Sequence, residues 1–130
     1  MMRSPDLQYC LISPFLWFDG AANALVTKDL ERAEKFLKEM KEKKDALDQI
    51  NTAYQSMYCA TQALLHSINY KSTGFRAIVT VLEEYFLKKG ILEPSYVEFL
   101  LRGQKMEGTP QENFEAAQSV AGTVKKVLNR

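Results

Sequence analysis

Apolar and small residues are densest between residues 49 and 66, a stretch that contains no glycine or proline. Within and just beyond it, apolar residues recur at steps of three and four: Ile50, Ala53, Met57, Ala60, Leu64 and Ile68. This spacing is typical of one face of an α-helix, and Tyr54, Tyr58 and Leu65 extend the apolar surface onto a second face. One neighbouring helix cannot cover both faces, so the pattern predicts a central, buried helix packed among several others.

An amphipathic pattern precedes this central helix and begins at Thr27, which is a suitable N-cap residue. The apolar stripe consists of Leu30, Ala33, Leu37, Met40 and Leu47. The opposite face alternates glutamate and lysine at helical spacing, which is typical of a solvated surface. We place a chain reversal near Asp48, because one continuous helix to His66 could not bury its own stripe.

Three further segments after residue 68 have helical patterns, and each has signals at its ends. A third helix runs from Phe75 to Lys88-Lys89-Gly90, where two cations and a glycine favour termination. Ser95-Tyr-Val-Glu98, preceded by Pro94, matches a capping box that opens a short helix. Thr109-Pro-Gln-Glu112 repeats that signal before the last helix, with proline at the first helical position.

No alternating strand pattern stands out, so the predicted fold class is all-α: an antiparallel, up-and-down bundle of four to five helices. The length of 130 residues, with 46% hydrophobic residues, indicates one domain, which we assign to residues 27–130. Residues 1–26, interrupted by Pro5, Pro14 and Gly20, are predicted to form an arm or short helix packed on the bundle.

The N-terminal residues loosely imitate a secretory signal, but Asp6, Pro14 and Asp19 are poorly placed for one. The chain also lacks any run near the roughly 18 apolar residues that a membrane span requires. We therefore expect a cytoplasmic protein with no membrane contact.

The charge balance and the chemistry-bearing residues argue against several functional classes. Seventeen basic and sixteen acidic residues leave a net charge of +1, so no overall field attracts a polyanion. Cys10 and Cys59 lie far apart, and a disulfide between them is disfavoured. His66 is the only histidine, so we predict no metal and no cofactor. Phosphate-binding glycine loops and Gly-x-Ser-x-Gly motifs are also missing.

The order of several short segments from Ala53 onward gives the chain a likeness to a known family. These segments are Ala53-Tyr54, Tyr58-Cys-Ala60 and Ala63-Leu-Leu65 in the central helix, Lys71-Ser-Thr-Gly74 before the third helix, Phe86-Leu-Lys-Lys-Gly-Ile91 at its end, and Arg102. With them the chain resembles the HEPN domain family over about its last hundred residues. It is most similar to a branch that lacks the full catalytic motif, although relatives there often carry a histidine where this chain has Lys71-Ser-Thr-Gly74.

The resemblance implies an up-and-down helical bundle that forms a homodimer, often beside a small nucleotidyltransferase. Catalytic members, including toxins of toxin–antitoxin pairs, cleave RNA without a metal. They use an arginine followed after about four to six residues by a histidine, because attack by a ribose 2′-hydroxyl needs a base and a cation. Arg102 occupies the arginine position, whereas Glu107 stands where the histidine is expected.

Each candidate residue has a functional and a structural interpretation. A buried carboxylate can act as a base, but Glu107 lies near Arg102 and Lys105, whose charges favour a surface salt bridge. Arg102 either binds an anion in a dimer cleft or stabilises the carbonyl end of its helix. Lys105 and Lys71 are candidate ligand-binding cations beside it. His66 does not match the catalytic position, and we expect it to be packed and hydrogen-bonded.

Tyr54 and Tyr58, one helical turn apart, are predicted to lie in the core or at a dimer interface, together with Trp17. The sequence thus leads to two functional hypotheses. The first is a non-catalytic, homodimeric HEPN-like module that binds a nucleotide, RNA or a nucleotidyltransferase through a cleft near Arg102. The alternative is a metal-independent HEPN-type endoribonuclease, a toxin of a toxin–antitoxin pair, with a substituted base.

Overall fold

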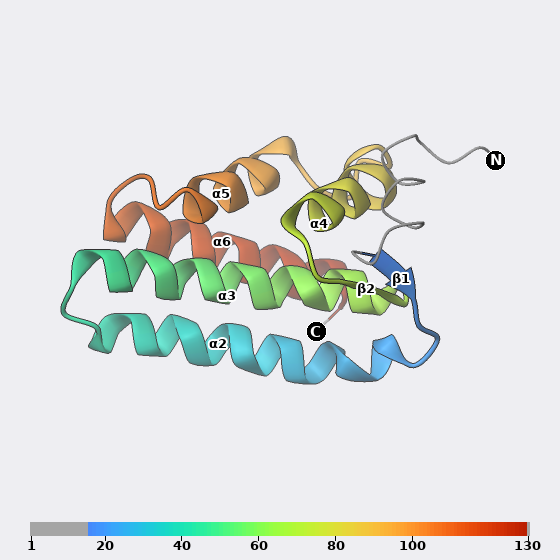
Figure 1. Ribbon diagram of the computed structural model, residues 1–130, viewed down its shortest axis with the longest axis horizontal. Coiled ribbons are helices and arrows are strands. Elements are labelled where there is room, and N and C mark those ends of the chain that lie inside the picture. The colour runs from blue at the N-terminus through green and yellow to red at the C-terminus, as the bar shows by residue number, and fades with distance from the viewer. Residues whose placement is uncertain (1–15, 130) are drawn as a thin grey trace.

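The computed structural model describes residues 16–129, in which two long antiparallel helices form the base of a bundle. Helix α2 (Val26–Glu42) and helix α3 (Ala46–Ser67) lie side by side (Figure 1). The chain reverses between Glu42 and Ala46, where the Asp45 side chain accepts a hydrogen bond from the Asp48 N–H at 3.1 Å. The reversal therefore lies a few residues before the predicted position, because Asp45 acts as the N-cap of α3.

The start of α2 and one residue of its predicted stripe differ from the sequence-based expectation. A short 3₁₀ helix, η1 (Ala22–Leu25), runs directly into α2, so Leu25 and not Thr27 is the N-cap, without a side-chain cap bond. Leu47, which the sequence pattern assigned to the stripe of the first helix, lies in α3 and is 60% exposed. The early reversal moves it to the other helix, where it faces away from the core.

Helix α3 is the centre of the fold. It contacts α2, η1, strand β2 (Tyr70–Ser72) and three later helices, α4 (Phe75–Leu82), α5 (Pro94–Gln104) and α6 (Pro110–Val127). Ala53, Met57, Ala60 and Leu64 of its predicted stripe are each 0% exposed, which confirms a central helix with several neighbours. The small alanine side chains permit this close packing.

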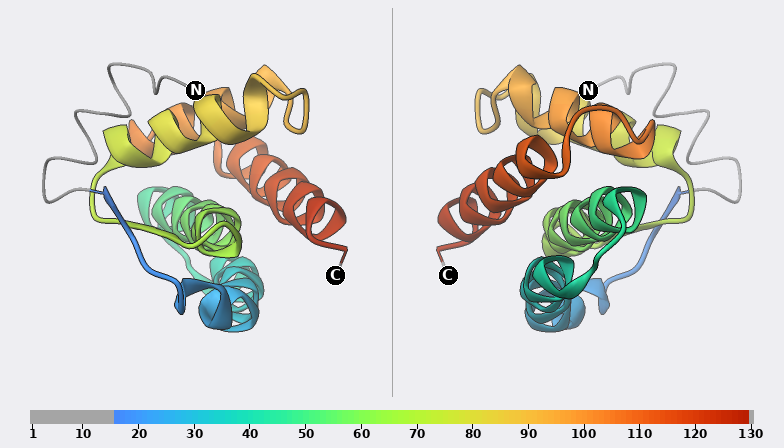
Figure 2. Two further views of the ribbon diagram at one scale, coloured as in Figure 1. Left: turned by 90° about the vertical axis from the view of Figure 1, so that its right-hand side faces the viewer. Right: turned by 90° about the vertical axis from the view of Figure 1, so that its left-hand side faces the viewer.

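Helix α4 (Phe75–Leu82), the π-helical turn η2 (Glu83–Leu87) and helix α5 (Pro94–Gln104) lie across α3 and α6 as a second layer (Figures 1 and 2). The predicted third helix corresponds to α4 and η2, and it is terminated, as predicted, at Gly90, whose positive φ of 71° favours glycine. Thr109 caps α6 in the predicted capping box with Glu112. The capping box predicted at Ser95 is wrong, because α5 begins one residue earlier at Pro94, after Glu93 as the N-cap.

One small sheet accompanies the helices among the described residues. Strand β1 (Leu16–Phe18) pairs antiparallel with β2, with Trp17 opposite Lys71. Each strand has three residues, which is too short for an alternating pattern to be recognised in the sequence. The fold class is nevertheless all-α, as predicted. From the predicted arm, Leu16 is buried whereas Trp17 and Phe18 are exposed; residues 1–15, including Cys10, lie outside the described part.

Candidate functional site

The turn between α5 and α6 brings Arg102 and Glu107 together. The Glu107 N–H donates to the Arg102 carbonyl at 3.0 Å, and the Met106 N–H donates to the Gly103 carbonyl at 3.0 Å. This pair of bonds is a Schellman motif, in which Met106 adopts the left-handed conformation at φ 59°. The backbone of the two candidate catalytic residues is therefore fixed at one corner of the bundle, which we call the Arg102 corner (residues 102–112).

The Arg102 side chain is held by contacts to α6 and to its own helix. Its Nη2 donates to the Glu112 carbonyl at 3.1 Å, and its Nη1 lies 3.8 Å from the Glu112 carboxylate. The guanidinium carbon lies 5.7 Å from the centroid of the Phe99 ring, within range of a cation–π contact. The side chain is 29% exposed. This geometry agrees with the structural interpretation of Arg102, and a ligand anion would have to compete with Glu112 for it.

Asn113 supports the Arg102 corner and was not singled out from the sequence. It is 0% exposed, and its Nδ2 donates to the carbonyls of Glu107 and Thr109, each at 2.9 Å. Its Oδ1 and the Nε of Arg102 are buried without a hydrogen-bond partner in the described part of the chain. The sequence feature that could have identified Asn113 is its position four residues before Ala117, which places a polar residue on the buried face of α6.

The other candidate residues of the predicted site are exposed or distant. Glu107 and Lys105 both have exposed side chains at the Arg102 corner. Lys71 lies on β2, toward the opposite end of the bundle (Figure 1), where its Nζ is 3.3 Å from a carboxylate oxygen of Asp19. The pKa of Asp19 is lowered mainly by the hydrogen bond that its carboxylate accepts from the Ala21 N–H, and further by the contact with Lys71. The structure thus brings Arg102, Lys105 and Glu107 together but not Lys71.

His66 is buried near the end of α3 and bonded to α2. Its Nδ1 lies 2.5 Å from Oδ2 of Asp29, and both residues are at most 8% exposed. It is packed and hydrogen-bonded, as we expected from the sequence. The part of α3 nearest to Arg102 is marked by Tyr54, which contacts Gly103, the residue after Arg102. His66 follows Tyr54 by twelve residues, or roughly 18 Å of helix. The imidazole is therefore far from Arg102.

Tyr54 packs beneath α5 at Gly103, and its ring centroid lies 6.2 Å from that of Tyr58. Both are half-buried against the core, so they contribute to the interior of the single chain. Burial, and to a smaller extent the neighbouring Tyr58, raise the pKa of Tyr54 to about 12. The Tyr54 hydroxyl is consequently neutral at ordinary pH.

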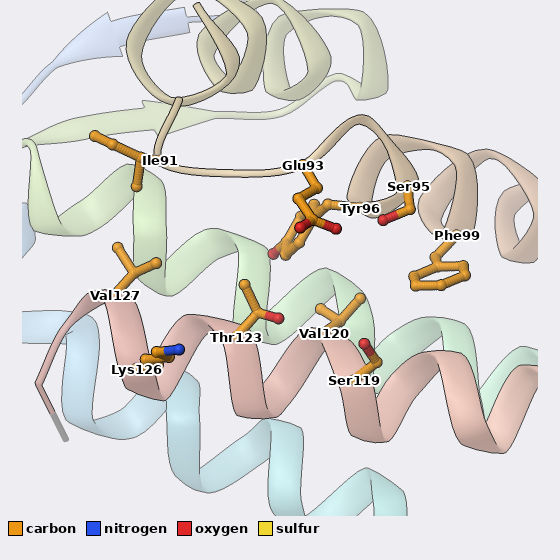
Figure 3. A pocket seen from close by; sticks show the side chains of 10 residues that line it. All are labelled: Ile91, Glu93, Ser95, Tyr96, Phe99, Ser119, Val120, Thr123, Lys126 and Val127. Carbon is orange, nitrogen blue, oxygen red and sulfur yellow. The ribbon is translucent and has the colours of Figure 1, made fainter. Parts of the chain in front are cut away.

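A cleft of about 360 Å³ lies between α5 and α6 (Figure 3). We call it the α5–α6 cleft. One wall comes from α5 and the segment before it, with Ile91, Glu93, Ser95, Tyr96 and Phe99. The other wall comes from α6, with Ser119, Val120, Thr123, Lys126 and Val127. The Phe99 ring lines the cleft and also lies 5.7 Å from the guanidinium carbon of Arg102, so Phe99 connects the cleft with the Arg102 corner, although no residue of that corner lines the cleft.

The polar groups of the cleft are largely unengaged. The side chains of Glu93 and Lys126 make no hydrogen bond or ion pair with another described residue, and they come from opposite walls (Figure 3). Thr61 and Thr80 elsewhere donate to the carbonyl four residues earlier, as helical hydroxyls commonly do. The hydroxyl of Thr123 makes no such bond within residues 16–129. The cleft therefore offers free donors and acceptors.

Tyr96 closes the inner side of the cleft. It is 4% exposed, and its hydroxyl lies 2.8 Å from the Thr61 hydroxyl of α3. Burial raises the pKa of Tyr96, a change that its bond to Thr61 only partly offsets. Tyr96 is thus a neutral, already bonded group, and recognition in the cleft depends on the other wall residues.

Comparisons of the chain with protein-family models, with curated proteins and with solved structures find no match. Within residues 16–129 no group of three or more histidine, cysteine, aspartate or glutamate side chains is placed to hold a metal ion. None of the described helices has the length and apolar character that crossing a membrane requires.

Proposed function

We propose that this protein is a non-catalytic, homodimeric HEPN-like module that binds a ligand or partner through a cleft near Arg102. The ligand classes implied by the family resemblance are a nucleotide, RNA or a nucleotidyltransferase. The observation that carries the proposal is a concave site between α5 and α6 that reaches the Arg102 guanidinium through Phe99. Its lining includes the exposed charges of Glu93 and Lys126, whose side chains have no partner among residues 16–129.

The placement of the histidine supports binding rather than RNA cleavage. The chain has one histidine, His66, which is buried in a contact with Asp29. It lies near the end of α3 that is distant from Arg102. Arginine stays protonated and can stabilise an anion but cannot remove a proton. Glu107 lies at the right spacing, yet its side chain is exposed to solvent, and a carboxylate needs burial to become an effective base. A general base contributes about 10²–10⁴-fold to such reactions, so the site should bind without appreciable turnover.

Exposed apolar side chains support the homodimer. Trp17 and Phe18 on β1 are 41% and 66% exposed, and Ile91 at the edge of the cleft is 46% exposed. Covering such side chains with a second copy removes apolar area from water, which favours association. Tyr54 and Tyr58 are less suited to this role, because both are partly buried against the core of the single chain and Tyr54 also contacts α5.

The test is equilibrium binding of a fluorescent mixed-sequence RNA and of labelled ATP, measured by anisotropy in EDTA. We expect weak binding that fades as salt is raised and that Arg102→Ala reduces several-fold. Lys28→Ala, which removes one cation from the exposed surface of α2, is the matched control and should have little effect. Equal losses in the two variants would show that Arg102 acts only through net charge. Metal-independent cleavage of the RNA that disappears in Arg102→Ala would instead establish the ribonuclease alternative.

A further inference from the structure

The charges of the α5–α6 cleft limit what can bind there. Its lining carries one carboxylate, Glu93, and one ammonium, Lys126, so the cleft has no net charge. A phosphate group that approached Lys126 would also enter the field of Glu93. A ligand that carries both a positive and a negative group, in contrast, can satisfy both side chains at once. The cleft is therefore electrostatically better suited to a zwitterion than to an anion.

The remaining wall residues define the body of such a ligand. Phe99, Val120 and Val127 provide apolar surface beside the two charged groups, and Figure 3 shows the Phe99 ring and Val120 on opposite walls. The hydroxyls of Ser119 and Thr123 can donate to a carboxylate or accept from an ammonium group. A volume of about 360 Å³ is at the small end of ligand sites, which span roughly 300–1,000 Å³.

We propose that the α5–α6 cleft binds a small zwitterion with an apolar body, the chemistry of an apolar amino acid or a short peptide built from such residues. Glu93 accepts from the ammonium group of the ligand, Lys126 donates to its carboxylate, and Phe99 with Val120 encloses the side chain. The inference goes beyond the proposed function, because it assigns a zwitterion to the part of the cleft around Glu93 and Lys126, whereas the proposed anion or partner site lies at the Arg102 end.

A series of related probes tests the requirement for both charges. L-Phenylalanine carries an ammonium and a carboxylate group, 3-phenylpropanoate carries only the carboxylate, and phenethylamine carries only the ammonium. Glycyl-L-phenylalanine carries both groups at a larger separation. Binding is followed by ¹H–¹⁵N chemical-shift titration of the full chain, which detects dissociation constants on the order of 1 mM or tighter. We expect one or both zwitterions to shift residues 91–99 and 119–127 and to bind at least about fivefold more tightly than either singly charged analogue.

Variants test the two charged residues separately. Glu93→Gln and Lys126→Gln keep the approximate shape of the side chain and should each weaken zwitterion binding by roughly 3- to 10-fold. Thr123→Val removes one hydroxyl at nearly constant volume and should weaken it as well. The controls are Glu98→Gln on the exposed surface of α5 and Lys28→Gln on α2, which make the same changes in net charge outside the cleft and should leave binding unchanged.

The outcomes separate this inference from the proposed function. ATP or inorganic phosphate that binds in the cleft more tightly than the zwitterions, and more tightly still in Glu93→Gln, would overturn the inference while supporting a binding module. Zwitterion shifts outside residues 91–99 and 119–127, or no shift at about 10 mM, would also overturn it. Metal-independent RNA cleavage by the wild type would overturn the proposed function, whichever small molecule occupies the cleft.

Discussion

The contact between α5 and α3 at Gly103 allows a quantitative prediction. A Cβ atom added at Gly103 would lie 2.8 Å from Cε of Met57 and 3.1 Å from Cδ1 of Tyr54. Met57 is flexible, but it is 0% exposed and has little space into which to move. We therefore expect Gly103→Ala to strain the packing that places Arg102 and the end of α5 on the central helix.

Two opposing effects determine the size of the change. Alanine is a better helix former than glycine by up to about 1 kcal/mol in a helix interior, and by less here because Gly103 is the penultimate residue of α5. Inserting a methyl group into a well-packed core costs typically 1–3 kcal/mol. The packing effect should prevail, so Gly103→Ala should lower the free energy of unfolding by about 1–2 kcal/mol.

Chemical denaturation followed by circular dichroism measures this difference, and Gly122→Ala is the matched control. Gly122 lies within α6, and a Cβ atom there would meet nothing within 4 Å. Only the helix-propensity effect remains, and Gly122→Ala should raise the free energy of unfolding by about 0.5–1 kcal/mol. If Gly103→Ala were as stabilising as Gly122→Ala, the close α3–α5 contact would be refuted.

Three further predictions follow from the core and the surface. Asp29→Ala and His66→Ala should each lower the free energy of unfolding by about 2–4 kcal/mol, because each change leaves a buried partner unpaired. The double variant should lose clearly less than the sum of the two, and additive losses in a double-mutant cycle would contradict a direct pair. The pKa of Tyr54 is about 12 in the folded chain against 10.0 as its ordinary value, so its contribution to stability is present below pH 10 and is lost as the pH rises toward 12. Tyr54→Phe should flatten that loss in alkaline unfolding experiments, and an unchanged pH profile would argue against the burial of this hydroxyl. Sedimentation at micromolar concentration should report a dimer, and a monomer would refute the proposed assembly.

Much of the bundle could be predicted because its signals are local. The stripe around Ala53 and Met57 has helical spacing and lies in the core, and the capping box at Thr109 forms as its sequence indicates. The errors occur where two local signals compete. Thr27 is a good N-cap residue, but the preceding 3₁₀ turn already extends the helix, and Pro94 starts α5 before Ser95 can cap it.

The candidate site was only partly predictable, because its parts come from distant segments. The spacing of Arg102 and Glu107 was visible, and both residues lie at one corner of the bundle. The α5–α6 cleft was not visible, since Glu93 and Lys126 are more than thirty residues apart and neither belongs to a motif. Lys71 was grouped with Arg102 by charge alone, and the structure places it on β2 with Asp19 as its partner.

We propose that the protein binds its ligand near Arg102 but lacks the base needed to cleave RNA. RNA cleavage in EDTA should be compared between the wild type and Glu107→His, which places an imidazole five residues after Arg102. We expect the wild type to stay at the buffer background and Glu107→His to cleave measurably through a restored general base. Robust metal-independent cleavage by the wild type that is lost in Arg102→Ala would show that the protein is a ribonuclease instead.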